Sequence, residues 1–238
     1  MNAKKFESDR RRSRPVTKRR KTDSWKRNKP AMVLVIIIVA MLVLSSAYVV
    51  FSSFNDTSSD DIGDENLGNP IAVLDTTMGT IKIELYEDKV PITAGNFKDL
   101  ANEGFYDNTK IHRISPGFMI QGGDPNSKDD DPSNDGFGDP GYTIQDEFHD
   151  DLSNIRGMIS MANSGPNTGG CQFFILVGDA IGLNNQHAVF GNVIEGMDVV
   201  DEIADLDHDG RYEPSPGGGR PLTDVVINSI IIEYSSKV

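Results

Sequence analysis

The feature that most constrains this chain is an apolar stretch from Ala31 to Phe51, whose twenty-one residues include no charge and only two serines. At a rise of about 1.5 Å per residue, a helix of this length crosses a hydrocarbon core roughly 30 Å thick. Ser45 and Ser46 do not prevent insertion, because a hydroxyl in a helix can bond back to a carbonyl one turn earlier. The stretch therefore predicts a transmembrane helix.

A cleaved signal peptide is the competing interpretation, since Ser45, Ser46 and Ala47 are small residues near the end of the stretch. Signal peptides usually have an apolar run of about 7 to 15 residues and a short basic leader. Here the run is longer and the leader has 30 residues, which favours an uncleaved signal anchor. The residues alone do not decide whether the anchor is cleaved.

Charge changes sign across this stretch. Residues 1–30 contain thirteen Lys or Arg and three acidic residues, whereas residues 31–238 contain ten and thirty-three. The basic leader predicts a cytoplasmic tail and places everything after the helix outside, in a single-pass protein of the cell membrane. A basic tail can also bind nucleic acid, but orientation of the helix and attraction to anionic lipid already explain these charges. We therefore expect contact with membrane lipid through residues 31–51, and none with nucleic acid.

Two further regions follow the stretch. Residues 52–69 are rich in Ser, Asp, Asn and Gly without periodicity, which predicts a flexible acidic stalk. Residues 70–238 are enough for one domain with a sizeable core. Cys171 is the only cysteine, so no internal disulfide stabilises this domain. Its stability must come from packing, and we expect a monomer.

Short strand signals dominate the domain. Alternation of apolar and polar residues over 80–86, after an apolar run over 71–76, predicts a hairpin with one buried face. Helical spacing after Pro91 and again from Met197 predicts two helices. Further strands are expected at 111–114, 118–121, 158–161, 173–176, 189–193 and 225–234. Such a set predicts a closed barrel or a sandwich, between which periodicity does not choose.

Two segments carry a resemblance to a known family: Ile111 to Asp124 (IHRISPGFMIQGGD) and Met161 to Phe174 (MANSGPNTGGCQFF). They resemble the cyclophilin family of peptidyl-prolyl isomerases, and the similarity extends from about Ile71 to Ile232. The resemblance implies a mainly β fold, a closed eight-stranded antiparallel β-barrel capped by two α-helices. Because the interior of such a barrel is packed, the site is expected on its outer surface.

The resemblance also implies the site. Arg113 matches the catalytic position, where a guanidinium can donate to the nitrogen of a twisted amide. The expected substrate-binding residues are Phe118, Met119, Gln121, Ala162, Asn163, Phe174, Leu183 and His187. Among these, Asn163 is expected to act through its main chain. Phe173, next to Phe174, should point to the opposite face and fill the core.

Other patterns are weaker. Gly182 stands where the family often has a tryptophan that helps to bind cyclosporin, which leaves sensitivity to that drug open. The four histidines do not have the spacing of a zinc site, and we expect neither a metal nor a cofactor in the isomerase site. Cys171 has no local base and is expected to be inert. Asp205, Asp207 and Asp209 have the spacing of the first ligands in a calcium-binding loop, but the usual glutamate at the twelfth position is absent. A solvated acidic turn is the alternative.

Three functions are compatible with these observations. The leading hypothesis is a peptidyl-prolyl cis-trans isomerase that rotates X-Pro bonds in unfolded or loop segments of exported or cell-surface proteins and so assists their folding. The alternative is a membrane-anchored module or holdase that binds proline peptides and does not need catalysis. The third is a calcium-dependent adhesion or scaffold protein.

Overall fold

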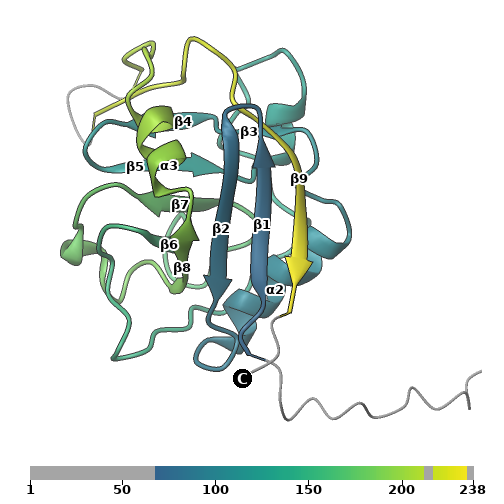
Figure 1. Ribbon diagram of the computed structural model, residues 1–238, viewed down its shortest axis with the longest axis vertical. Coiled ribbons are helices and arrows are strands. Elements are labelled where there is room, and N and C mark those ends of the chain that lie inside the picture. The colour runs from purple at the N-terminus through teal and green to yellow at the C-terminus, as the bar shows by residue number, and fades with distance from the viewer. Residues whose placement is uncertain (1–67, 212–216, 235–238) are drawn as a thin grey trace, which may run out of the picture. The chain divides into compact units, whose positions relative to one another are not determined.

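The computed structural model describes residues 68–211 and 217–234, and a nine-stranded antiparallel sheet organises them (Figure 1). These residues belong to one compact unit, Gly63–Val238. The strands are β1 Ile71–Thr76, β2 Gly79–Leu85, β3 Thr109–Lys110, β4 Arg113–Ser115, β5 Met119–Gly122, β6 Met158–Met161, β7 Phe173–Leu176, β8 Val189–Glu195 and β9 Val226–Glu233. The helices are α2 Pro91–Asn102 and α3 Met197–Ala204, with short 3-10 turns η3 Pro125–Lys128 and η4 Ile181–Leu183.

The predicted hairpin is confirmed. Strands β1 and β2 pair antiparallel, with Leu74 opposite Ile81, and alternate residues of both strands are buried. At the turn, the Thr76 hydroxyl accepts the backbone N–H of Gly79 at 3.1 Å. Gly79 has φ +142, and a Cβ there would lie 2.9 Å from a methyl group of Val199 on α3. Glycine at this position thus lets α3 pack closely against the hairpin.

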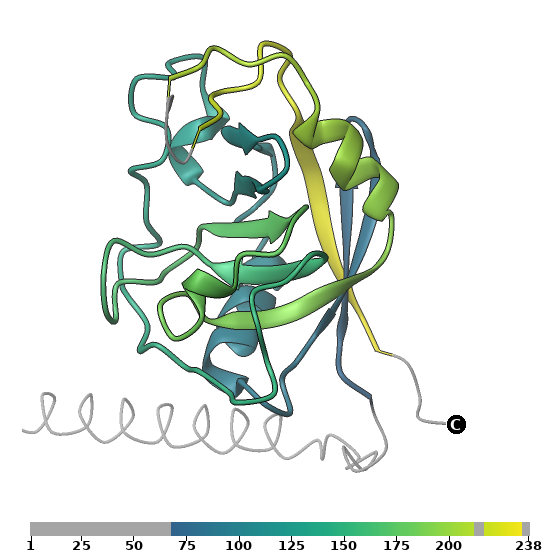
Figure 2. The same ribbon diagram turned by 90° about the vertical axis from the view of Figure 1, so that its left-hand side faces the viewer.

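The two predicted helices are also present, toward opposite ends of the sheet (Figures 1 and 2). Helix α2 begins at Pro91, whose missing N–H costs nothing in the first turn. The carboxylate of Glu147 accepts the N–H groups of Ile92 and Thr93, at 2.9 and 3.0 Å. A side chain distant in sequence thereby supplies the cap that helix termini require, which ties the loop around Glu147 to α2.

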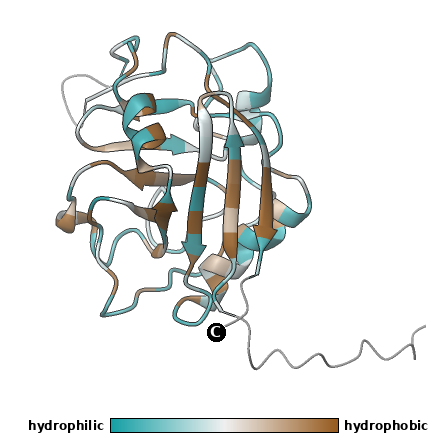
Figure 3. Cartoon of the chain, viewed as in Figure 1, coloured by the Kyte–Doolittle hydropathy of each residue, from teal (hydrophilic) through white to brown (hydrophobic). Residues whose placement is uncertain are grey.

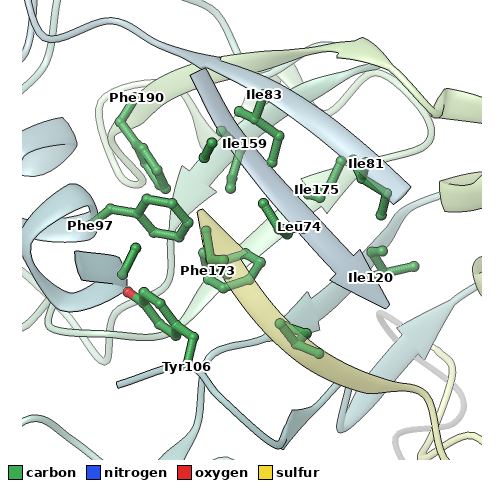
Figure 4. Close-up of a cluster of buried hydrophobic side chains, with 14 of the residues drawn as sticks. Leu74, Ile81, Ile83, Phe97, Tyr106, Ile120, Ile159, Phe173, Ile175 and Phe190 are labelled. Atoms are coloured by element: carbon green, nitrogen blue, oxygen red, sulfur yellow. The ribbon is translucent and has the colours of Figure 1, made fainter. Parts of the chain in front are cut away.

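The core lies between the sheet and α2. Phe97 of α2 meets Tyr106, Phe173 and Phe190 with ring centroids 5.0, 5.4 and 5.2 Å apart, and all four side chains are fully buried (Figure 4). Hydrophobic residues gather on the strands, whereas the connecting loops are mainly hydrophilic (Figure 3). The expected core position of Phe173 is confirmed.

The expected closure of the barrel is wrong. The strands form one open row, β3-β9-β1-β2-β8-β6-β7-β5-β4, and within the described residues the edge strands β3 and β4 do not pair. Other groups satisfy both edges. Ile114 of β4 exchanges backbone hydrogen bonds of 2.8 and 2.9 Å with Gly219, and the Lys110 N–H of β3 donates to the Ser127 hydroxyl at 2.9 Å. The structure is an open half-barrel of nine strands, in place of the predicted closed barrel of eight.

Within residues 68–211 and 217–234, neither α2 nor α3 nor any other helix is long and apolar enough to span a bilayer. The predicted transmembrane helix at 31–51, the cytoplasmic tail at 1–30 and nearly all of the stalk at 52–69 lie outside the described residues.

Candidate functional site

A second apolar cluster lies apart from the core. Met119, Phe174 and Leu176 are buried in it, and the half-buried residues packed against them are Phe118, Met158, Ala162, Ala180 and Leu183. Successive residues of a strand point to opposite faces, so Phe174 joins this cluster while its neighbour Phe173 fills the core. The structure therefore gathers all five predicted apolar contact residues: Phe118, Met119, Ala162, Phe174 and Leu183.

A row of side chains crosses the sheet beside this cluster. Arg113 of β4 pairs with Gln121 of β5, which in turn pairs with Phe174 of β7. Residues directly opposite on neighbouring strands point to the same face, with Cβ atoms about 5 Å apart. The strand register thus brings the predicted catalytic residue, a predicted backbone-contact residue and a predicted pocket residue onto one face. Arg113 itself is partly exposed.

His187 forms one wall of the cluster. Its ring meets that of Phe174 edge to face, with centroids 5.4 Å apart and an interplanar angle of 80°. Its Nδ1 atom lies 3.1 Å from the carbonyl oxygen of Met161. Because a carbonyl can only accept, this contact requires the proton on Nδ1 and fixes the ring orientation. The structure thus places His187 against Phe174, and its role in binding substrate stays a prediction.

Asn163 is held by the protein's own main chain. Its amide donates to the Gln186 carbonyl at 2.7 Å, and its side-chain oxygen accepts from the Gly165 N–H at 3.2 Å. Both ends of the side chain are therefore occupied. The action of Asn163 through its main chain stays a prediction.

Gln172 belongs to the site and escapes prediction. Its side-chain oxygen accepts from Gln121 at 3.1 Å, its amide donates to the Gly138 carbonyl at 2.9 Å, and its main-chain oxygen accepts from Ala162 at 2.9 Å. It thus connects both predicted segments with the loop between them. The period of two along a strand could have predicted this residue. Gln172 lies two residues before Phe174, so its side chain points to the same face of the sheet.

A cavity of about 620 Å³ adjoins the row of Arg113, Gln121 and Phe174. Its lining comprises Gln121, Gly136, Phe137, Gly138, Asp139, Gly141, Tyr142, Thr143, Ala162, Asn163, Ser164, Thr168, Gly170, Cys171 and Gln172. Five of these residues, Gln121, Gly138, Ala162, Asn163 and Gln172, also take part in the contacts described above. The loop over 136–143 supplies one wall.

Gly182 lies in η4, next to Leu183 of the apolar cluster. The residue is exposed, and a Cβ built there meets no other atom within 4 Å. The structure therefore has room for a side chain at this position.

No group of three or more His, Cys, Asp or Glu residues in the described part of the chain is arranged to hold a metal ion. In the acidic turn, one carboxylate oxygen of Asp209 accepts the N–H groups of Arg211 and Arg220, at 3.0 and 2.9 Å. Its role there is to hold the turn. Burial raises the pKa of the Cys171 thiol to about 12, and the carboxylates of Asp124 and Asp139 add to that shift. The thiol is therefore a poor nucleophile.

His112, next to Arg113 in the chain, is only 3% exposed. Burial lowers the pKa of its ring to about 4; the charge of Asp124 partly offsets this shift, and that of Arg113 reinforces it. Between about pH 6.5 and pH 4 the unfolded chain binds a proton that the folded chain excludes, so the free energy of unfolding falls as the pH falls through this range.

We expect His112→Gln to weaken this pH dependence. In urea melts, the stability lost between pH 7 and pH 4.5 should be smaller in His112→Gln than in the wild type by on the order of 2 kcal/mol. His149→Gln is the control, because the His149 side chain is 36% exposed, and it should keep the wild-type loss. Equal losses in the wild type and His112→Gln would contradict the burial of a neutral ring.

Comparison with known proteins agrees with this geometry. Residues 71–232 match the family described as cyclophilin type peptidyl-prolyl cis-trans isomerase/CLD. Peptidyl-prolyl cis-trans isomerase CYP18-1 of Arabidopsis thaliana is 42% identical over 165 residues, which cover 67% of this chain and 93% of that protein. The probable peptidyl-prolyl cis-trans isomerase A of Mycobacterium leprae is 38% identical over 191 residues, covering 73% and 97%.

A solved structure is also similar. The crystal structure of a cyclophilin-type isomerase from Cryptosporidium parvum, determined in the presence of the dipeptide Ala-Pro, matches with a TM-score of 0.60 and 31% identity. The match covers 68% of this chain and 98% of that one. A protein with a fold similar to this half-barrel has thus been crystallised in the presence of a proline dipeptide.

Proposed function

We propose that this chain, which belongs to the cyclophilin family and is a peptidyl-prolyl cis-trans isomerase, acts on proline-containing segments of exported or cell-surface proteins. The observation that supports a groove for such segments is the row of Arg113, Gln121 and Phe174 beside the apolar cluster. The cluster would hold the proline ring. The polar side of the row would contact the peptide backbone.

The reaction requires no covalent step. Rotation about an X-Pro bond is opposed by a barrier of about 18–20 kcal/mol, because the C–N bond has partial double-bond character. In the twisted state the nitrogen lone pair is no longer delocalised and can accept a hydrogen bond. Stabilising that state by about 7 kcal/mol would accelerate rotation by roughly five orders of magnitude.

Arg113 is the residue we assign to this stabilisation. Its guanidinium is permanently charged and presents several donors in a fixed plane. A bond to the proline nitrogen forms only as the amide twists, so it favours the transition state over the bound substrate. Gln121 and the main chain at Ala162 and Asn163 would hold the flanking peptide, and Phe118, Met119, Phe174, Leu183 and His187 would enclose the ring.

The crystal structure of the Cryptosporidium parvum relative in the presence of Ala-Pro supports proline-containing segments as the substrate class. We further propose that the protein works as a monomer anchored in the cell membrane. Support for the anchor is the uncharged stretch Ala31 to Phe51 after a strongly basic leader, which also favours a cytoplasmic N-terminus.

This topology makes a direct prediction. In intact cells, protease added outside should digest residues 70–238, while a tag placed before residue 31 should survive until the membrane is opened. Alkaline carbonate extraction should leave the full-length chain in the membrane pellet. A protected domain, or a chain released by carbonate, would overturn the proposed localisation without affecting the isomerase assignment.

A further inference from the structure

The cavity beside the proposed groove opens onto the same peptide. Gln121, Ala162 and Asn163 line the cavity and also belong to the proposed peptide-binding surface. A strand advances by about 3.3 Å per residue, so a side chain within about three residues of the proline can reach it. The cavity is therefore placed to read the sequence around the proline.

Two aromatic rings form its rim. Phe137 is 81% exposed, which is unusual for a large apolar side chain, and Tyr142 is 48% exposed. The Tyr142 hydroxyl donates to the Asn96 side chain at 2.7 Å, and the Asn96 amide donates in turn to the Gly170 carbonyl at 2.6 Å. Tyr142 is thus fixed to helix α2 and to the cavity lining before any ligand arrives.

The cavity has a negative character. Among its lining residues Asp139 is the only carboxylate, and no Lys, Arg or His is present. One oxygen of Asp139 accepts the Gly141 N–H at 2.7 Å, which orients the carboxylate. The charge of Asp139 also acts on Cys171, another lining residue. Burial raises the pKa of the Cys171 thiol most, and the charges of Asp124 and Asp139 raise it further.

We propose that the cavity rimmed by Phe137, Asp139 and Tyr142 selects clients with a lysine or arginine within about three residues of the isomerised proline. A carboxylate next to exposed aromatic faces suits a cation, which ring faces also attract. A purely apolar side chain would match the two rings but would give the Asp139 carboxylate no compensation for the water that it displaces. The inference rests on the proposed isomerase function.

Peptide turnover by the full-length chain tests the selection. Each peptide contains one proline and, at one of the three positions on either side, lysine, arginine, norleucine or glutamate. At one or more of these positions we expect kcat/KM for lysine and arginine to exceed that for norleucine by about threefold to tenfold, with glutamate lowest. The difference should shrink as salt is added, because Asp139 is solvent-accessible.

Matched variants separate this cavity from the general acidity of the domain. Asp139→Asn keeps the shape and the acceptor for Gly141 but removes the charge, and should bring the ratio of lysine to norleucine turnover close to one. Asp150→Asn makes the same change of net charge at an exposed residue outside the cavity and should keep the wild-type ratio. Phe137→Ala should lower the ratio in part.

The possible failures are distinguishable. If the wild type turns over no peptide, the proposed function is wrong. If it turns over lysine and norleucine peptides equally at every position, only the selection is wrong. If Asp139→Asn and Asp150→Asn lower the ratio equally, attraction comes from the whole domain, and the role of the cavity is overturned.

Discussion

Replacing Arg113 by alanine is expected to lower kcat/KM for a proline peptide by about 10²- to 10³-fold, the usual effect of removing one donor that acts in the transition state. The proposed reason is the loss of the guanidinium that meets the twisted amide nitrogen. The measurement is peptide isomerisation by full-length wild type and Arg113→Ala. Arg113→Lys keeps the charge but not the planar group, so its rate should fall between the two.

Folding must be checked beside activity, because Arg113 is partly buried. A cooperative thermal transition in each variant would show that the domain remains folded. Wild-type turnover by folded Arg113→Ala would refute the assignment of Arg113. If the folded, inactive variant still protects clients from aggregation or retains a cellular phenotype, the groove also acts as a binding module without catalysis.

The neighbours Phe173 and Phe174 should respond in opposite ways to truncation. Phe173 is fully buried among Phe97 and Tyr106, so Phe173→Ala leaves a cavity in the core and should cost about 3–5 kcal/mol of unfolding free energy. Phe174 contacts the proposed proline pocket, and losing its ring should lower kcat/KM by about 10- to 100-fold, the equivalent of one buried aromatic contact.

Urea denaturation and peptide turnover, measured on both variants, test this pair. Phe174→Ala should lose less stability than Phe173→Ala, because its cluster is smaller and borders the surface. Phe173→Leu and Phe174→Leu serve as conservative controls. Each should show a smaller effect of the same kind as the alanine variant at the same position. If the two alanine variants lose stability and activity in the same proportion, the separation of core and pocket faces is incorrect.

Local patterns predicted the hairpin and both helices because their causes are local. The alternation of apolar and polar residues over 80–86 indicates a strand with one buried face, whichever strand pairs with it. Pro91 marks a helix start through its own fixed φ. The resemblance to cyclophilins predicted the apolar pocket residues, and alternation confirms why Phe173 and Phe174 separate. None of these inferences required knowledge of distant contacts.

What the sequence missed depends on distant contacts. In the open sheet, Gly219 and Ser127 form hydrogen bonds with the two edge strands, and neither residue carries a signal for that role. Glu147 caps a helix that begins at Pro91, through two hydrogen bonds that no local motif predicts. The cavity wall likewise comes from the loop over 136–143, whose glycines and proline are typical of any loop.

The position of β9 has a consequence for the order of biosynthesis. This last strand, residues 226–233, lies inside the sheet, where it pairs with β1 on one side and with β3 on the other. A nascent chain that lacks them exposes the unpaired backbone of β1, a template for wrong pairing. Because synthesis proceeds from the N-terminus, the half-barrel cannot form until its C-terminal strand has left the ribosome. An anchored enzyme of this topology would cross the membrane as an incomplete sheet and fold on the far side.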